Sequence, residues 1–465
     1  MKGDFSRLTF DPRKQFTRVL MQQGRVQLDA DWNEQAGILL HYLQTLAADL
    51  IGPHGGPKDD LGFAIEAVTN HQNQLTDLKV LQGRYYVDGL LCENLEPEGV
   101  SYFEQPDLAL DPEQDELPDA PFLAYLDVWE RHLNHLQVDG IREVALGGPD
   151  TASRAQVVWQ VRVAEDLPEG TRTERAWPNA ASWKKWVEGR QPQNRGRLKA
   201  RAKGDPDSTD PCLASPAARY RGPENQLYRV EIQWREPEPA PDSKATRALT
   251  FKWSRENGSV VFAIREFDVE GRTVVLESLG RDEATGLKRG DWVEIVDDET
   301  ETGGESWSLM KVDEINEARM SVTLKPADDD LAPNLPVYEE GEAQKKHALL
   351  RRWDHAASPP PKTGEKPKGA VLFIFQEDAK LEDTWLTLEQ GIQIQFQPGG
   401  AYRPGDYWLI PARTATGDVE WPGSARDPQP VPPHGVEHHY APLALVEAAD
   451  KVRDLRRPFK ALGVA

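Results

Sequence analysis

Closely spaced carboxylates are the first residues in this sequence whose types and spacing allow chemistry. Asp29 and Asp31 lie two residues apart, and Asp127 and Glu130 lie three apart. Two such groups, one on each side of a glycosidic bond, can hydrolyse it. However, the chain holds 77 Asp and Glu residues, so close pairs arise by chance. Asp29 and Asp31 also fall where the start of a helix favours negative charge. We therefore expect these residues to be structural.

A second candidate site is a histidine-rich segment near the C-terminal end. His434, His438 and His439 occur together with Glu437, and imidazole and carboxylate groups suit zinc or a similar ion. The surrounding prolines and glycine disfavour a helix. In an extended segment His434 and His438 share one side, while His439 points to the other. Two ligands make a weak metal site, so we predict a hydrogen-bonded loop, with no metal and no cofactor.

Residues 172–203 form a locally basic segment. They contain ten Lys and Arg against two Glu, a local charge of +8, with Trp177, Trp183 and Trp186 interleaved. Positive charge combined with aromatic faces suits single-stranded nucleic acid. The whole chain, however, carries a formal charge of −22, which repels a polyanion. We therefore predict a docking surface for an acidic neighbour and no nucleic-acid partner.

The sequence contains no motif typical of nucleophilic catalysis or phosphate binding. It has no GxSxG, Walker or GxGxxG pattern, and neither Cys92 nor Cys212 has a histidine nearby in sequence. The two cysteines form no disulfide framework and no zinc-ligand spacing, so we expect each to be a small buried hydrophobe. Fourteen Trp residues could stack on sugar rings, but many lie in predicted strands, where core packing is the default. We therefore expect no enzymatic activity.

The clearest predicted element is a helix that begins near Asp29 and ends at Gly52-Pro53. Asp29 or Asp31 can cap its start, and glycine followed by proline is typical of a helix end. Its apolar residues recur at alternating spacings of four and three and form a seam: Trp32, Ala36, Leu39, Leu43, Leu46 and Leu50. This seam suits one partner helix or sheet face. Two interpretations are open: the seam packs on its own domain, or it lies in an oligomer interface.

The rest of the sequence predicts mainly β structure. Short alternating runs such as Leu227–Trp234 are separated by Gly- and Pro-rich turns, and Asp88-Gly89 between apolar arms predicts a hairpin. We expect a mainly β (α+β) protein with several small antiparallel sandwich or barrel modules and an N-terminal helix. The predicted domains are residues 1–60 (arm and seam helix), 61–240 (β-rich with an irregular insertion), 241–350 (small barrel or sandwich), 351–369 (Pro-rich linker) and 370–465 (C-terminal β domain).

Composition and charge argue against several classes of protein. A surplus of acidic residues, 77 against 55 Lys and Arg, disfavours a surface that grips nucleic acid or anionic lipid throughout. No segment approaches the roughly 18 apolar residues of a membrane span. The first residues lack the apolar core of a signal peptide. We expect a protein made in the cytoplasm without an export signal.

Several long phrases of the sequence resemble an uncharacterised domain family found in phage-tail-like contractile injection systems. The phrases span most of the chain and include MKGDFSRLTFDPRKQF, FKWSRENGSVV and GDYWLIPARTATGDVEWP. The resemblance implies a structural component of the injection particle, at the baseplate or in an attached fibre- or cage-like appendage. It also implies assembly in the cytoplasm and release as part of an extracellular particle. It brings no catalytic residues with it.

We therefore expect a structural subunit that acts through protein–protein assembly, with itself and with other particle subunits as partners. The seam helix would supply the contact, and the β modules a rigid body. One alternative is a glycan-binding appendage that recognises a target surface. A second alternative is a glycan-cleaving enzyme, which requires two facing carboxylates in a cleft.

Overall fold

The computed structural model describes residues 1–108, 110, 115–146, 150–170, 180–191, 193–203, 219–233, 250–283, 285–304, 306–326, 333–354 and 384–461. The chain forms two compact units that are discontinuous in sequence. We call them the barrel unit (residues 1–8, 133–153 and 194–435) and the helix unit (residues 9–132, 154–193 and 436–465). Of the predicted linker, residues 351–353 belong to a strand and 355–369 lie outside the described residues. In the described residues, no helix is both long and apolar enough to cross a membrane.

In the part of the helix unit that the structure describes, there are three small sheets and two α-helices. Its largest sheet has the order β25-β24-β7-β8, and the other two have the orders β26-β1-β4-β5 and β2-β3-β6. The strands are β1 (His54–Pro57), β2 (Ile65–Thr69), β3 (Leu75–Val80), β4 (Gly83–Val87), β5 (Leu90–Asn94), β6 (Val100–Ser101), β7 (Phe122–Leu133), β8 (Arg154–Ala164), β24 (His439–Ala448), β25 (Lys451–Asp454) and β26 (Pro458–Phe459). The helices are α1 (Asp29–Ile51) and α2 (Ala180–Arg190).

Strand β7 is buried on both of its faces. Phe122, Ala124 and Leu126 pack into one core together with strands β2 to β5, whereas Leu123 and Tyr125 pack into a second core beneath α2. This alternation follows from the two-residue period of a strand. Cys92 on β5 is buried in the first core, as predicted, and burial raises the pKa of its thiol. Cys212 lies outside the described residues.

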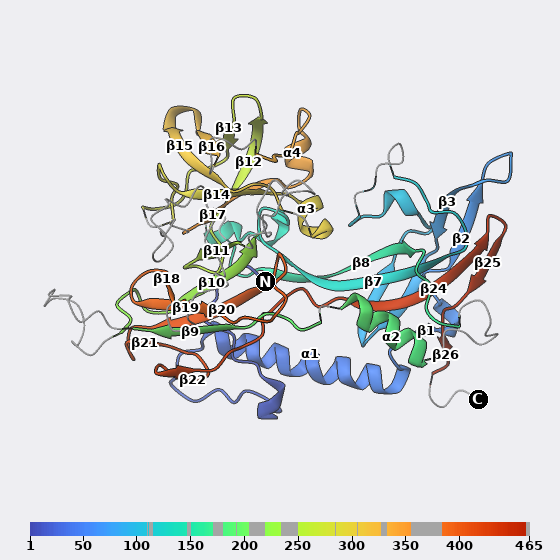
Figure 1. The fold of residues 1–465 in the computed structure, drawn as a ribbon, viewed down its shortest axis with the longest axis horizontal. Coiled ribbons are helices and arrows are strands. Elements are labelled where there is room, and N and C mark those ends of the chain that lie inside the picture. The colour runs from blue at the N-terminus through green and yellow to red at the C-terminus, as the bar shows by residue number, and fades with distance from the viewer. Residues whose placement is uncertain are drawn as a thin grey trace, which may run out of the picture. The chain divides into compact units, whose positions relative to one another are not determined.

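The barrel unit contains a two-layer sandwich and a closed barrel (Figure 1). The sandwich has the sheets β11-β10-β20-β21 and β18-β19-β9, and the barrel has the order β12-β13-β16-β15-β14-β17. The sandwich strands are β9 (Leu198–Ala202), β10 (Gln226–Gln233), β11 (Thr250–Ser254), β18 (Leu386–Thr387), β19 (Ile392–Phe396), β20 (Tyr407–Arg413) and β21 (Asp418–Val419), and a separate hairpin has β22 (Gly423–Ser424) and β23 (Asp427–Pro428). The barrel strands and short helices are β12 (Val261–Asp268), β13 (Thr273–Leu276), β14 (Trp292–Val296), α3 (Asp298–Gly303), β15 (Met310–Asn316), β16 (Ser321–Pro326), α4 (Glu342–Lys345) and β17 (Leu349–Trp353). The predicted mainly β architecture with small antiparallel modules and an N-terminal helix is therefore confirmed.

Alternate residues of these strands fill two separate cores. In the barrel, Val293 and Ile295 of β14 and Val322 and Leu324 of β16 point inward. The sandwich core receives every second residue of β10 and β20 in the same way, with Trp408 fully enclosed. Strands β11, β14 and β17, by contrast, are buried along their whole length. The side chains on the second face of these three strands therefore make contacts outside the two apolar cores.

A buried ion network occupies those second faces and joins the barrel to the sandwich. Lys252 of β11 lies 2.7 Å from both carboxylate oxygens of Glu294 on β14, and the Trp353 indole donates to Glu294 Oε2 at 3.0 Å. The Lys252 ammonium also lies 4.5 Å from the Trp353 ring centroid. Each charge is thus paired and hydrogen-bonded, as a charge removed from water requires.

The network extends to β10 and to the N-terminal segment. Glu231 accepts a hydrogen bond from the Arg229 guanidinium at 2.6 Å. Its carboxylate also lies 3.5 Å from the Lys252 ammonium and 3.8 Å from the Lys2 ammonium. Burial alone would raise the pKa of Glu231, but Lys2, Arg229 and Lys252 together lower it below its usual value. Three elements that are distant in sequence are therefore held by one chain of charges.

Removing Lys252 should destabilise the barrel unit strongly. Lys252→Met leaves Glu294 and Glu231 buried without their shared cation, which costs about 3–5 kcal/mol of unfolding free energy. Lys325→Met is the matched control, because Lys325 forms an equally short pair with Asp313 (2.8 Å) that is partly exposed to solvent. That control should change stability by less than about 1 kcal/mol. Urea unfolding followed by tryptophan fluorescence measures both, and equal effects of the two variants would contradict the role given to the network.

Candidate functional site: an exposed apolar helix and arm

All six residues of the predicted seam lie exposed on α1. The exposed fraction is 66% for Trp32, 52% for Leu39, 57% for Leu43, 43% for Leu46 and 62% for Leu50, and Ala36 is exposed as well. The first interpretation of the seam, packing on its own domain, is therefore not what the structure shows. The buried side chains of α1 are Ala30 and Ile38, on another face of the helix.

The segment that precedes α1 adds further exposed apolar side chains. Residues 15–22 and 25–28 have no helical or strand structure. Their large apolar side chains point to solvent: Phe16, Leu20, Met21, Val26 and Leu28. We call these five residues and the six seam residues the arm–helix surface. Single exposed apolar residues are normal on a protein surface, so the number of them on one arm and one helix makes this surface the candidate interaction site.

Specific contacts hold the arm and α1 in place within the helix unit. Thr9 donates to Glu34 Oε2 at 2.9 Å, and the backbone amide of Val19 donates to Gln35 Oε1 at 2.8 Å. Phe10 packs so closely over Gly37 that a Cβ there would lie 3.0 Å from the ring. The seam is thus presented by a helix whose opposite side is fixed.

The β4–β5 turn supports the second half of α1. The predicted hairpin is present, with Asp88-Gly89 at its turn. Gly89 adopts a φ of +84°, and a Cβ at this position would lie 2.2 Å from the carbonyl oxygen of Gln44. Glycine is therefore required both for the turn and for the close approach of the helix.

The two members of each carboxylate pair noted in the sequence point in different directions. The N-cap of α1 is Leu28, not Asp29 or Asp31, and both aspartates lie in the first helical turn. Residues two apart do not share a helix face. Asp127 is buried on β7 while Glu130 is exposed, because three residues along a strand place them on opposite faces.

The three histidines each have a separate partner. His434 stacks on Tyr407 with ring centroids 5.4 Å apart, His438 Nδ1 lies 2.7 Å from Asp127 Oδ1, and His439 Nδ1 lies 3.0 Å from Asp88 Oδ2. Burial alone would lower the pKa of His439, but the hydrogen bond and charge of Asp88 raise it. Across the described residues, no group of three or more His, Cys, Asp or Glu is placed to hold a metal ion.

Two tryptophans of the basic segment, Trp183 and Trp186, are core residues. Trp183 and Trp186 of α2 are buried, and their rings stack on each other with centroids 4.8 Å apart. Arg190 lies over Trp186, 3.8 Å from the ring centroid. These rings are therefore not available to stack on nucleic-acid bases. Trp177 lies outside the described residues.

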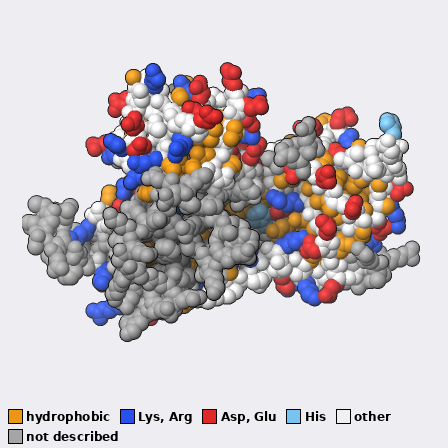
Figure 2. All heavy atoms as spheres, turned by 45° about the horizontal axis from the view of Figure 1, so that its top comes forward, with side chains coloured by type: hydrophobic (Ala, Val, Ile, Leu, Met, Phe, Trp, Pro, Cys, Tyr) orange, Lys and Arg blue, Asp and Glu red, His pale blue; other side chains and the backbone are white. Residues whose placement is uncertain are grey.

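On the face drawn in Figure 2, acidic and basic side chains are interspersed over the barrel.

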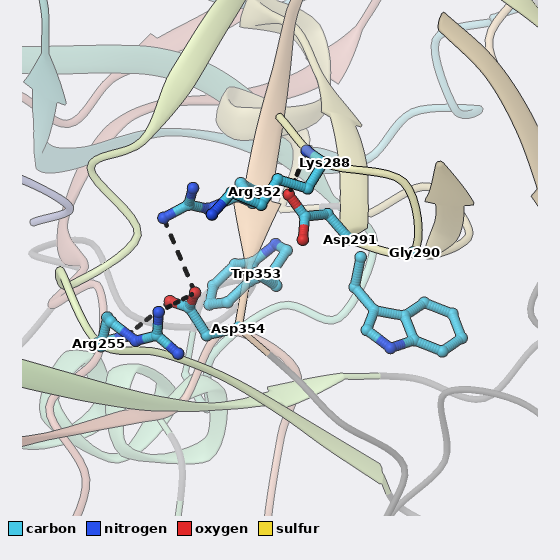
Figure 3. Close-up of a pocket in the computed structure, with 8 residues that line it drawn as sticks. Arg255, Lys288, Gly290, Asp291, Arg352, Trp353 and Asp354 are labelled. Carbon is cyan, nitrogen blue, oxygen red and sulfur yellow. Dashed lines mark hydrogen bonds and ion pairs between the residues drawn. The ribbon is translucent and has the colours of Figure 1, made fainter. Parts of the chain in front are cut away.

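A polar cavity of about 160 Å³ lies at one end of the barrel (Figure 3). It is lined by Arg255, Lys288, Gly290, Asp291, Trp292, Arg352, Trp353 and Asp354. Arg255 and Arg352 approach Asp354 from two sides, with N–O distances of 3.5 and 3.8 Å. The charges that line the cavity are thus largely paired with one another.

The charge of Asp354 also affects the nearby carboxyl of Glu256. Burial and the neighbouring Asp354 charge raise the pKa of Glu256 to about 8, despite Arg352 and Arg255 nearby. Among the described residues, Glu256 Oε2 is buried without a hydrogen-bond partner and lies 3.7 Å from the Arg352 guanidinium.

The acid pair should make stability depend on pH. Glu256 has an ordinary pKa of 4.5 and a folded-state pKa of about 8, so between these values only the folded protein binds the proton. Its contribution to stability therefore falls as the pH rises through this window, by up to about 1.4 kcal/mol per pH unit. Glu256→Gln removes the titrating carboxyl and with it this contribution, so its Tm should fall less than that of the wild type between pH 6 and 8.

Thermal unfolding monitored by circular dichroism at half-unit pH steps measures this slope. Glu283→Gln serves as the control, because Glu283 is 96% exposed and pairs only loosely with Lys288 at 3.6 Å. The raised pKa assigned to Glu256 is wrong if Glu256→Gln and Glu283→Gln both retain the wild-type pH dependence.

Comparison with known proteins identifies one family. No curated protein and no solved structure matches the chain. Residues 1–176 and 181–462 match the family described as "Family of unknown function (DUF6519)". Since this match covers almost the whole sequence, the chain belongs to the DUF6519 family.

Proposed function

We propose that this chain is a structural subunit of a phage-tail-like contractile injection particle, placed at the baseplate or in an attached fibre- or cage-like appendage. It acts by protein–protein assembly, and the arm–helix surface is the contact with another subunit. The observation that carries the proposal is the exposure of the complete seam on α1. The particle itself is proposed from the resemblance of the sequence phrases.

The energetics of the seam support assembly over an isolated monomer. Each exposed apolar Å² that becomes buried contributes roughly 25 cal/mol, and the heptad-type spacing offers a continuous row of such side chains to a partner helix. A large hydrophobic patch left in water favours association. The fixed opposite side of α1 lowers the ordering cost of binding, because the helix is already formed and placed.

The glycan-binding alternative has a narrower basis. Stacking on sugar rings needs an exposed aromatic face. Among the tryptophans that the structure describes, seven are buried: Trp129, Trp183, Trp186, Trp253, Trp292, Trp353 and Trp408. Trp32 is strongly exposed, but it belongs to the arm–helix surface. We therefore favour assembly, and the same residue separates the two functions experimentally.

Polar substitutions in the seam should lower the oligomeric state. Leu39→Ser with Leu43→Ser removes two central apolar contacts while leaving the buried face of α1 untouched. We expect the molar mass from light scattering to fall to that of the 52.2 kDa chain. Val144→Ser with Leu146→Ser is the matched control, because both residues are highly exposed but lie in the barrel unit. It should keep the wild-type mass.

Two results would contradict the proposal. One is a wild-type mass equal to a single chain over the micromolar range. The other is an unchanged mass for the seam variant when circular dichroism shows that it is folded. Binding to a glycan array that disappears with Trp32→Ala, without any change of mass, would favour the glycan-binding alternative.

A further inference from the structure

The seam on α1 has the same spacing in both directions along the helix. Its six residues are separated by four, three, four, three and four positions, so the midpoint of the seam lies level with His41. In an antiparallel pair of helices about a two-fold axis at this midpoint, every seam residue faces a seam residue of the second copy. The facing pairs are Trp32 with Leu50, Ala36 with Leu46, and Leu39 with Leu43. The seam is therefore complementary to itself in this orientation.

The charges of α1 distinguish the antiparallel pair from a parallel one. The helix carries four acidic side chains and no Lys or Arg. A parallel pair would place Asp49 beside Asp49 and would bring helix ends of like sign together, and both contacts are repulsive. An antiparallel pair avoids both, but Asp49 then lies level with Asn33 of the second copy, only about 3 Å along the axis from Asp31. This orientation therefore requires a cation near Asp49.

The arm is attached to α1 at the level and on the flank where this cation is required. The amide of Val19 donates to Gln35 Oε1 at 2.8 Å, and the arm continues into the helix at Leu28. Gln35 and Asp49 lie on one flank of α1, because fourteen residues are close to four helical turns. A two-fold axis perpendicular to the helices keeps this flank on the same side of both copies. The arm of one copy therefore lies beside Asp49 of the other.

Two arginines of the arm can supply the cation. Arg18 and Arg25 are exposed, and among the described residues neither makes an ion pair. Residues 20–28 are exposed throughout, and within the described structure residues 20–27 make one hydrogen bond, from the Arg25 amide to the Gln22 carbonyl. This part of the arm is thus held at both ends but contacts little of its own chain. It can meet a second copy at a low ordering cost.

We infer that two copies of this chain associate through their seams as an antiparallel pair of α1 helices, with Arg18 and Arg25 of each copy beside Asp49 of the other. The inference rests on the proposed assembly function and names the partner as a second copy of this chain. The seam contributes the apolar burial of the contact. The arm contributes the charges that fix the direction and the register of the two helices.

Disulfide trapping tests the direction of the pair. A disulfide requires two Cα atoms within about 7 Å. In the antiparallel pair the two copies of residue 32 are about 27 Å apart, whereas residue 32 faces residue 50. An equimolar mixture of Trp32→Cys and Leu50→Cys should therefore form a band of twice the 52.2 kDa chain mass on a non-reducing gel, and neither variant alone should form it.

Two controls accompany this experiment. The mixture of Ala36→Cys and Leu46→Cys tests the same register without removing the Trp32 side chain, and it should also cross-link only when the two variants are mixed. The unaltered chain, oxidised in the same way, controls for Cys92 and Cys212. Cross-linking of each single variant with itself would show a parallel pair, and absence of cross-linking in both mixtures would show that the seam does not face a second α1. Either result overturns the inference.

Charge reversal and its rescue test the contact of the arm. Arg18→Glu with Arg25→Glu should raise the dissociation constant at least about tenfold, because Asp49 and Asp31 then face like charges. Adding Asp49→Arg to this variant should recover most of the affinity, since the contact is restored with its signs exchanged. Analytical ultracentrifugation of the full chain gives each constant.

The matched control for the charge reversal is Lys58→Glu with Arg281→Glu. It changes the net charge of the chain by the same amount at two exposed positions away from the arm and α1. Its dissociation constant should stay at the wild-type value. The arm contact is wrong if the arm variant also keeps the wild-type value, or if Asp49→Arg recovers no affinity.

The failure of this inference and the failure of the assembly function are distinguishable. If the trapping or the charge reversal fails while the Leu39→Ser and Leu43→Ser variant still dissociates, the antiparallel pair is wrong and assembly through the seam remains. A wild-type chain that stays monomeric overturns both.

Discussion

The pairing of Lys252 with Glu294 is the contact on which the barrel unit depends. Apolar patterning fills the barrel and the sandwich separately, but it does not determine how one is attached to the other. The strands that meet between them carry buried charges, and a buried charge is tolerated only in a position where its partners reach it. The network therefore favours one position of the barrel on the sandwich over other positions that would bury a similar apolar area. Lys2 extends the same requirement to the N-terminal segment, which is held through Glu231.

Local signals in the sequence account for the elements that were predicted correctly. Gly52 ends α1 and Asp88-Gly89 forms the hairpin turn, because these residues have conformational preferences that tertiary contacts need not create. Alternation of apolar and polar residues likewise identifies β10, because successive side chains of a strand point to opposite faces; its apolar residues enter the sandwich core, and Arg229 and Glu231 on the other face join the buried ion network. The N-cap was misassigned because aspartate stabilises both the cap and the first turn, and the sequence does not distinguish these positions.

Contacts between distant segments could not be predicted. Strand β24 pairs with β7 more than 300 residues away, so His438 meets Asp127 through a register that no local pattern contains. The acid pair of Glu256 and Asp354 arises in the same way, because a turn after β11 and the end of β17 come together. Trp183 and Trp186 resemble binding residues in sequence, since burial beneath a sheet depends on the fold and not on the neighbouring charges. A pattern of residue types thus suggests chemistry, but only the pairing of strands decides which side chains are left to perform it.

In α1, unlike in the strands, the apolar residues of the pattern are the exposed ones. An apolar stripe usually marks the side of a helix that faces its own core. Here the inward side has one large apolar residue, Ile38, and small residues such as Ala30 and Gly37, and Gly37 lets Phe10 of the arm approach closely. The larger residues, including Leu39 and Leu43, are left outside. The arrangement is consistent with a helix whose fold is completed by its own unit and whose apolar stripe is completed by a neighbour.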